Sequence, residues 1–342
     1  MIKAIVVSTN FRNMENWLPV FEKIMEDGGR CRAIHFPWNG DDSFHRMDEL
    51  KIPVKYSQEI PALNNSALPE DELSKILHEH IEADDVVFLC DMQSYPSSKV
   101  HEILLKRERR PLVIGLQHGL FQSWWLYNRN FCADYLLSFN RRVISSIHPE
   151  YRKRVHPVGL PKLDRLAGMA TADGRYVLYL AQKYPEAGLV EGVLKEIEKD
   201  LRIPVFVRNH PQYPEEIHHA PDLEMPLVNG KPIANCTYDE QLAHASWVLT
   251  SHSTGGLEAL YLKKNVVLLP NHGLTAWPDY PGVAFDISAR SVFHALGRTK
   301  AYRQDIDLFL KNSMDSRYRS HTKSALSTIY SLVERAYPVR LP

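Results

Sequence analysis

The stretch WVLTSHSTGGLEALYLKKNVVLLP, residues 247–270, decides the fold of this chain. It begins with Trp247–Ser251, a short apolar run with β-branched residues, which predicts a buried strand. Small residues predict a tight turn over 251–256, apolar side chains at helical spacing predict a helix over 257–261, and Val266–Leu269 predicts a second buried strand. A strand, a glycine turn, a helix and a strand form a βαβ unit, which indicates a parallel sheet.

The turn in this unit is a candidate anion site. Backbone N–H groups at a helix N-terminus attract a phosphate, glycine allows a close approach, and hydroxyls add donors. A carboxylate in the first turn of the helix could accept a hydrogen bond from a ribose hydroxyl. The candidate ligand-binding residues are Ser251, Ser253, Thr254, Gly255, Gly256 and Glu258. The alternative is a structural turn with a capping Ser or Thr and a Glu favoured by the helix dipole.

The composition is that of a globular protein with two domains. At 342 residues the chain is long enough for two domains of ordinary size. Lysine plus arginine and aspartate plus glutamate number 41 each, so no net charge favours a nucleic acid partner. The cysteines are far apart and form no CxxC pair, which favours buried thiols in a reducing compartment over a zinc site. No signal peptide or membrane-spanning apolar run occurs, so we expect a cytoplasmic protein.

Strands alternate with helices along the whole chain. The predicted strands of the first half lie at 2–8, 31–36, near Val54, 85–90, 112–116 and 135–138, and those of the second half at 176–180, 204–208, 247–251, 266–269 and 284–287. This alternation predicts an α/β fold with doubly wound parallel sheets. Prolines and a glycine at Val155–Asp164 interrupt both the helical and the strand-like spacing of apolar residues. We therefore predict an N-terminal domain over 1–168, a C-terminal domain over 169–320, and a C-terminal helix over 321–342 that packs back toward the N-terminal domain.

Four short motifs carry a family resemblance. They are VHPVGLPKLD at 155–164, Arg-Asn-His-Pro at 208–211, SHSTGGLEAL at 251–260 and Gln-His-Gly at 117–119. Together they resemble GT-B glycosyltransferases of bacterial surface-polysaccharide assembly, in the capsule-synthesis branch that includes Kdo transferases. The resemblance implies two Rossmann-like domains facing a central cleft, with the donor nucleotide held mainly by the C-terminal domain. It also implies a nucleotide-sugar substrate such as CMP-Kdo.

The chain departs from better-known patterns in two places. Many retaining GT-B enzymes have a Glu-x7-Glu pair, but Asn265 and Val266 stand where the second glutamate would fall after Glu258. The stereochemistry of transfer is therefore left open. No G-x-G-x-x-G follows the first strand, so a dinucleotide oxidoreductase is unsupported.

Strand-end residues supply the candidate catalytic groups. Asp91 and His118 each follow an apolar strand, which places them at the ligand-binding edge of the first sheet. His118 could act as a general base, and Asp91 as a base or a nucleophile. The alternatives are a turn-capping Asp91 and a His118 that only holds its loop.

Other residues are assigned to the two substrates. On the acceptor side the candidates are Gln117, Gly119 and Trp124, although paired tryptophans near a helix start are more often core residues. On the donor side Arg208 and His210 could offset the charge of the leaving phosphate. Their alternative is a strand end with a solvated arginine and a proline-terminated turn.

The hypothesis is a metal-independent GT-B glycosyltransferase that moves a sugar to a surface-polysaccharide or lipid-linked glycan acceptor. The sequence Asp-Ile-Asp at 305–307 matches D-x-D but falls in a helix-like segment, so no metal and no cofactor are expected. The alternatives are a UDP-sugar 2-epimerase, a CDP-glycerol-type glycerophosphotransferase and a non-catalytic nucleotide-sugar-binding module. The basic runs at 106–110 and 141–142 suggest peripheral contact with the inner membrane, against the simpler interpretation of a solvated face.

Overall fold

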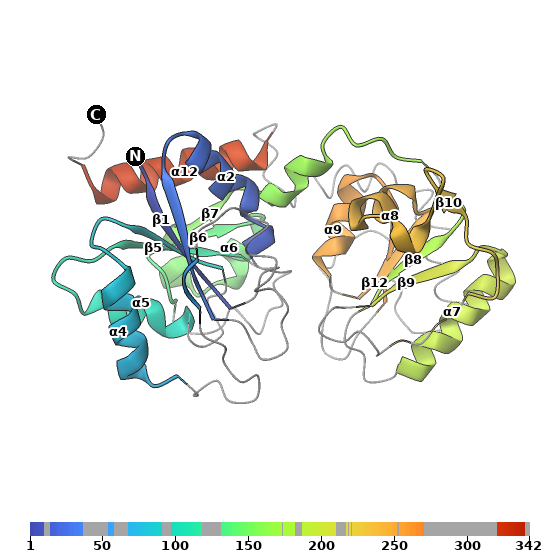
Figure 1. Ribbon diagram of the computed structural model, residues 1–342, viewed down its shortest axis with the longest axis horizontal. Coiled ribbons are helices and arrows are strands. Elements are labelled where there is room, and N and C mark those ends of the chain that lie inside the picture. The colour runs from blue at the N-terminus through green and yellow to red at the C-terminus, as the bar shows by residue number, and fades with distance from the viewer. Residues whose placement is uncertain are drawn as a thin grey trace. The chain divides into compact units, whose positions relative to one another are not determined.

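The computed structural model divides the chain into two compact units (Figure 1). Unit 1 comprises Met1–Asp164 and Asn312–Pro342, and unit 2 comprises Arg165–Lys311. The structure describes residues 1–9, 14–36, 54–57, 68–90, 97–117, 131–172, 174–181, 187–209, 217, 219, 221–251, 253–269 and 320–338.

Unit 1 is built on a parallel sheet. Its described strands are β1 (Lys3–Ser8), β2 (Arg30–His35), β3 (Val54–Ser57), β4 (Val86–Leu89), β5 (Leu112–Leu116), β6 (Tyr135–Ser138) and β7 (Val155–Pro157). They are arranged in the order β3-β2-β1-β4-β5-β6-β7, and every pair is parallel. The order reverses between β1 and β4, which is where sheets of this kind bind ligands.

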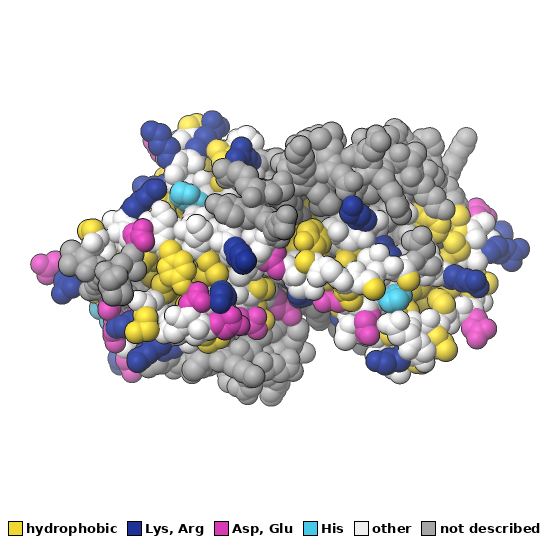
Figure 2. Space-filling view, turned by 90° about the horizontal axis from the view of Figure 1, so that it is seen from above, with side chains coloured by type: hydrophobic (Ala, Val, Ile, Leu, Met, Phe, Trp, Pro, Cys, Tyr) yellow, Lys and Arg dark blue, Asp and Glu magenta, His cyan; other side chains and the backbone are white. Residues whose placement is uncertain are grey.

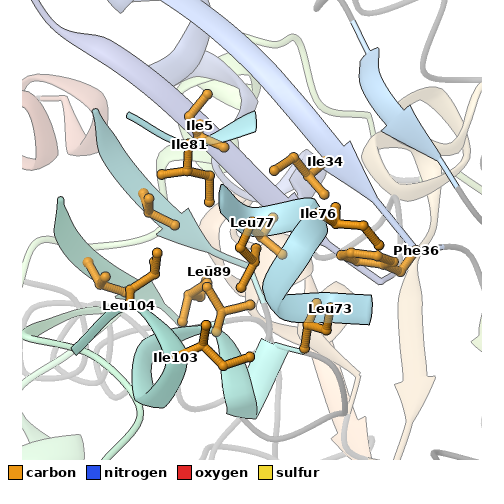
Figure 3. Close-up of a cluster of buried hydrophobic side chains, with 14 of the residues drawn as sticks. Ile5, Ile34, Phe36, Leu73, Ile76, Leu77, Ile81, Leu89, Ile103 and Leu104 are labelled. Carbon is orange, nitrogen blue, oxygen red and sulfur yellow. The ribbon is translucent and has the colours of Figure 1, made fainter. Parts of the chain in front are cut away.

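Helices cover both faces of this sheet. They are α2 (Leu18–Glu26), α4 (Glu70–His80), α5 (Ser97–Leu105), α6 (Arg142–Ser146) and α12 (His321–Ala336), with 3-10 helices η2 (Pro149–Arg154) and η3 (Pro161–Leu166). Ile5 of β1 packs into a buried cluster with α4 and α5 (Figure 3). On the opposite face Phe88 of β4 meets Phe21 of α2 edge to face, with ring centroids 5.5 Å apart. Alternate side chains of buried strands thus supply two cores.

The C-terminal helix belongs to unit 1. Helix α12 contacts α2, and the Asp164 carboxylate caps its first turn. That carboxylate accepts hydrogen bonds from Ser320 Oγ at 2.7 Å, His321 N at 2.9 Å and Thr322 N at 2.8 Å. Just beyond the helix, the Tyr337 hydroxyl accepts from the amide of Leu112 at 2.8 Å. Hydrogen bonds between residues far apart in sequence therefore attach the C-terminal segment to the rest of unit 1.

Unit 2 has a smaller parallel sheet. Its described strands are β8 (Val177–Leu180), β9 (Val205–Arg208), β12 (Trp247–Thr250) and β13 (Asn265–Leu268), in the order β13-β12-β8-β9, beside a hairpin of β10 (Leu227–Val228) and β11 (Lys231–Pro232). Its helices are α7 (Ala187–Leu201), α8 (Tyr238–His244) and α9 (Thr254–Tyr261), with a 3-10 turn η4 (Ile233–Asn235). Tyr179, Leu194 and Leu249 lie in one buried cluster, which places α7 against the sheet. The order reverses between β8 and β12.

The predicted fold class is confirmed. The stretch that decided it forms β12, α9 and β13. Helix α9 begins at Thr254, three residues earlier than predicted, so Thr254, Gly255 and Gly256 belong to the helix and not to the turn before it. Both sheets are parallel, and within the described residues helices follow β1, β3, β4, β6, β8 and β12, as the alternation predicted. Within the described residues, no helix combines the length and the apolar composition that a membrane crossing requires.

Candidate functional site

The turn between β12 and α9 lies at the reversal point of the unit 2 sheet. Thr250, the last residue of β12, pairs with Leu180, the last residue of β8. Ser251 follows directly and is 4% exposed, and its Oγ has no hydrogen-bond partner among the residues that the structure describes. A buried hydroxyl is rarely left unpaired in a folded protein. Its position beside a helix N-terminus fits a donor that is kept for a ligand.

Helix α9 is capped by its own serine. The Ser253 Oγ accepts a hydrogen bond from the Gly255 amide at 3.1 Å, and the Ser253 carbonyl accepts from Gly256 N, also at 3.1 Å. Ser253 therefore engages the amides of both glycines, and their role in binding a ligand stays a prediction. The Ser253 hydroxyl accepts a hydrogen bond here, so its proton remains to be donated. The amide of Thr254, as the first helical residue, also points out of the helix end.

A close approach explains the glycine at 255. A Cβ added there would lie 2.6 Å from Leu180 Cδ1 and would also collide with the Tyr238 hydroxyl. Tyr238 begins α8, so the glycine lets α8, α9 and the end of β8 converge. Burial raises the pKa of Tyr238 well above its ordinary value, and the Glu258 carboxylate raises it further. The phenol therefore stays protonated near the helix N-terminus.

Arg208 extends the site at the end of β9. Its Nη1 donates to Gln241 Oε1 at 2.7 Å, and its guanidinium carbon lies 5.0 Å from the centre of the Tyr238 ring. These two contacts fix the guanidinium in one orientation. The next residue, Asn209, donates from Nδ2 to the Ile217 carbonyl at 3.1 Å. Arg208 is thus a preorganised cation at a strand end.

Glu258 lies in a buried ion network. It is 1% exposed, and its Oε2 lies 3.7 Å from Nη2 of Arg165. The same Nη2 donates to Asp239 Oδ1 at 2.8 Å. Asp239 sits in the first turn of α8, behind a capping box in which Thr237 and Glu240 bond each other's backbone amides. One arginine therefore links the first turn of α8 to Glu258, which lies beyond the first turn of α9.

Sequence reasoning missed four members of this cluster: Arg165, Tyr238, Asp239 and Gln241. The capping box at 237–240 was recognisable and places Tyr238 and Asp239 at a helix start. No local pattern indicated that this helix start meets the turn after β12, because the two segments are joined only by tertiary packing.

Asp91, His118, Gly119, Trp124 and His210 lie outside the described residues, as does the Asp-Ile-Asp sequence at 305–307. Their roles stay predictions.

Gln117, predicted on the acceptor side, lies at the end of β5 in the described part of the chain. It is 1% exposed, its Oε1 accepts from Phe139 N at 2.7 Å, and its carbonyl accepts from Trp17 Nε1 at 2.9 Å. It therefore ties the end of β5 to neighbouring segments. Its role on the acceptor side stays a prediction.

The basic run at 106–110 is largely engaged within unit 1. Lys106 lies 3.5 Å from Glu70, Arg107 donates to the Ile81 carbonyl at 2.8 Å, and Arg110 donates to Asp134 at 2.8 Å. Such partners weaken the case for a free basic surface there. On the face drawn in Figure 2, basic and acidic side chains are interspersed. Within the described ranges, no group of three or more His, Cys, Asp or Glu side chains is placed to hold a metal ion.

Comparison with known proteins establishes the fold. No family model matches the chain, and no curated protein matches it in sequence. Among solved structures, a putative UDP-N-acetylglucosamine 2-epimerase from Listeria monocytogenes is 11% identical with a TM-score of 0.65, covering 99% of this chain and 98% of that one. MnaA of S. aureus with UDP is 14% identical with a TM-score of 0.67, covering 97% of each chain.

A third similar structure is the wall teichoic acid polymerase TagF. It is 11% identical with a TM-score of 0.54, and the match covers 98% of this chain and 90% of that one. At these identities the likeness concerns the fold alone. The chain has the GT-B-like architecture of two Rossmann-like units that these proteins share.

Proposed function

We propose that this protein binds a nucleotide-linked sugar at the β12–α9 turn of unit 2 and transfers the sugar to a glycan or lipid-linked acceptor. The observation that carries the proposal is the buried Ser251 hydroxyl, which has no described partner at the reversal point of the sheet. Around it stand the capped N-terminus of α9, the fixed guanidinium of Arg208 and the Glu258 carboxylate. The similar structures support a nucleotide ligand, since MnaA is a UDP complex.

The chemistry of transfer fits these groups. A departing nucleotide gains negative charge on its phosphate, and preorganised donors stabilise that charge most effectively in a site that excludes water. The Ser251 and Ser253 hydroxyls, the helix N-terminus and Arg208 would supply such donors. Glu258 would accept a hydrogen bond from a ribose hydroxyl. Asp91 and His118 remain the candidates for activating the acceptor, and no metal is needed in this scheme.

Substitution of Ser251 should change nucleotide affinity without lowering the stability of the fold. Removing a buried hydroxyl that has no partner should cost the fold little, so Ser251→Ala should unfold at the wild-type temperature or slightly above it. The same change should weaken nucleotide binding by about tenfold. Ser246→Ala is the matched control, because the Ser246 hydroxyl bonds the Gly174 carbonyl inside the fold. That variant should lose stability and keep its nucleotide affinity.

A thermal-shift panel of CMP, CDP, UDP and GDP tests the proposal directly. A ligand at about 100 times its dissociation constant stabilises the folded state by about 2.7 kcal/mol, which shifts the transition by several degrees. A shift for at least one nucleotide, reduced in Ser251→Ala, is the expected result. No shift with any of the four would contradict the proposal.

The proposal includes a specific donor substrate, CMP-Kdo. Transfer of Kdo from CMP-Kdo rests on the likeness of the SHSTGGLEAL turn to capsule-synthesis enzymes, and it predicts that CMP gives the largest shift. With CMP-Kdo and an acceptor glycan, we expect release of CMP that depends on the acceptor and persists in excess EDTA. Asp91→Asn and His118→Ala should then abolish transfer while CMP binding is retained.

A second candidate reaction is 2-epimerisation of a UDP-sugar. The structural likeness to the putative UDP-N-acetylglucosamine 2-epimerase of Listeria monocytogenes favours it. It predicts that UDP gives the largest shift and that a UDP-sugar is converted at C2 without any acceptor. A CDP-glycerol-type glycerophosphotransferase, the other reaction that the sequence left open, predicts that CDP gives the largest shift. Binding of one nucleotide with no turnover of the matching substrates would indicate a binding module.

A further inference from the structure

Three neighbouring residues follow the carboxyl ends of the strands in the unit 2 sheet. The last residues of β12, β8 and β9 are paired side by side, and Ser251, Ala181 and Asn209 come directly after them. The amide of Ala181 donates to the Arg208 carbonyl at 3.0 Å, which continues the pairing of β8 with β9 beyond the strand end. Ser251 and Asn209 therefore lie on either side of Ala181, and two strand spacings separate their backbones by about 10 Å.

Ser251 and Asn209 belong to the same face of this sheet. Side chains alternate between the faces along a strand, so Ser251 lies on the side of Leu249 and Asn209 on the side of Val207. Leu249 and Val207 both pack in the buried cluster that contains α7. Asn209 also meets this cluster directly, because its Nδ2 donates to the carbonyl of Ile217, another member. The two polar side chains thus share the α7 side of the sheet edge.

Each of these side chains has a buried polar atom that no hydrogen bond satisfies. Ser251 is 4% exposed, and neither its Oγ nor the buried Oδ1 of Asn209 has a partner in the part of the chain that the structure describes. The Asn209 amide is held in one orientation, because the Ile217 carbonyl can accept a hydrogen bond only from Nδ2, at 3.1 Å. Buried polar atoms are nearly always paired in folded proteins. Two unpaired atoms on one face of a ligand-binding edge therefore indicate a ligand that supplies both partners.

We propose that Asn209 recognises the base of a pyrimidine nucleotide, with its Oδ1 accepting a hydrogen bond from an N–H donor of the base while Ser251 binds the phosphate. The inference rests on the proposed function, which places the phosphate at the β12–α9 turn. A nucleotide spans a similar distance from its phosphate to the outer edge of its pyrimidine. The donor is the amino group of cytosine or the N3–H of uracil. A base without such a donor leaves the buried Oδ1 unpaired and binds more weakly.

Ligands that lack this donor test the inference. The wild type is titrated calorimetrically with CMP, CDP and UDP, each beside the analogue with the same phosphates whose base is 2-pyrimidinone. This base has neither the amino group of cytosine nor the N3–H of uracil. For each pyrimidine nucleotide that binds, the analogue should bind about tenfold more weakly, as expected when one buried hydrogen bond is lost.

Substitutions show whether Asn209 is the source of this preference for the natural base. Asn209→Leu removes the acceptor, so it should bind the natural nucleotide about tenfold more weakly than the wild type and lose almost nothing more with the analogue. Asn209→Asp keeps an acceptor oxygen and should retain the preference. Ser251→Ala should weaken the natural nucleotide and the analogue equally, because Ser251 contacts the phosphate that both ligands carry.

Asn265→Leu is the matched control. Asn265 begins β13 at the opposite edge of the sheet, and its Nδ2 also donates to a backbone carbonyl, that of Ser246, at 3.4 Å. The substitution removes a similar structural hydrogen bond and should leave both affinities at their wild-type values. Unfolding midpoints measured for all variants identify any general loss of structure.

The outcomes separate the inference from the function on which it rests. A wild type that binds the analogue as tightly as the natural nucleotide overturns the role of Asn209, whether or not the variants fold. Retention of the preference in Asn209→Leu has the same meaning. If the wild type binds GDP alone, recognition of a pyrimidine is wrong while nucleotide binding stands. If it binds none of CMP, CDP, UDP and GDP, the proposed function itself fails.

Discussion

Gly255 offers a prediction whose sign can be worked out from the structure. A methyl group at this position would lie 2.6 Å from Leu180 Cδ1 and would collide with the Tyr238 hydroxyl. Forcing an extra methyl group into a packed site destabilises a protein by about 1–3 kcal/mol. Replacing a helical glycine by alanine stabilises the helix by about 0.5–1 kcal/mol. Gly255→Ala should therefore destabilise unit 2 by about 1–2 kcal/mol, which lowers its unfolding temperature by about 2–8 °C.

A second glycine provides a control, because its substitution by alanine should change the stability of unit 2 in the opposite direction. Gly192 lies inside α7, and a Cβ added there meets nothing within 4 Å. Gly192→Ala should therefore stabilise unit 2 by about 0.5–1 kcal/mol. Both variants are compared by thermal unfolding followed by circular dichroism. Shortening Leu180 to alanine should relieve part of the cost of Gly255→Ala in the double variant. A Gly255→Ala protein as stable as Gly192→Ala would refute the close approach.

Three further predictions concern unit 1. Asp164→Ala removes the acceptor that caps α12 and should cost about 1–3 kcal/mol in urea unfolding; an unchanged midpoint would contradict the capping role. Tyr337→Phe leaves the Leu112 amide without its acceptor, so this amide should exchange hydrogen faster, with a loss of about 1–3 kcal/mol. Burial opposes ionisation of Asp134, but hydrogen bonds from His101 and Arg110 hold its pKa well below the ordinary value. The ionised Asp134 should contribute its full stabilisation above the unfolded-state pKa of about 4, and this contribution should be lost as the pH falls below that value. In urea unfolding measured at a series of pH values, the free energy of unfolding of Asp134→Asn should therefore fall less steeply below about pH 4 than that of the wild type.

The sequence was informative wherever one segment determines its own structure. The run from Trp247 to Leu269 contains two apolar strands, a glycine turn and a helical spacing of apolar residues, and each of these signals is local. The alternation of such segments was enough to predict parallel sheets. The strand order was not predictable in this way, because it depends on which strands meet after the chain has crossed over.

The polar partners were the part that local patterns could not supply. Arg165 is 74 residues from Asp239 in sequence, and Leu112 is 225 residues from Tyr337. The basic run at 106–110 illustrates the same limit. As a sequence it indicates a charged surface, but Arg110 pairs with Asp134, which lies on a different segment. Such pairings decide whether a charge faces solvent, and only the folded chain reveals them.

The charges around the β12–α9 turn lead to a final expectation. Arg165 and Arg208 carry positive charges, and Asp239 and Glu258 carry negative charges, so the formal charges of these four side chains cancel. A phosphate bound there would be held mainly by directed donors at short range, namely the serine hydroxyls and the helix N-terminus. Salt screens long-range attraction much more than contacts of this kind, so raising NaCl from about 50 to about 500 mM should weaken nucleotide binding by no more than about threefold. Calorimetric titration at both salt concentrations measures this, and a loss of tenfold or more would mean that a net positive field, and not the turn, holds the phosphate.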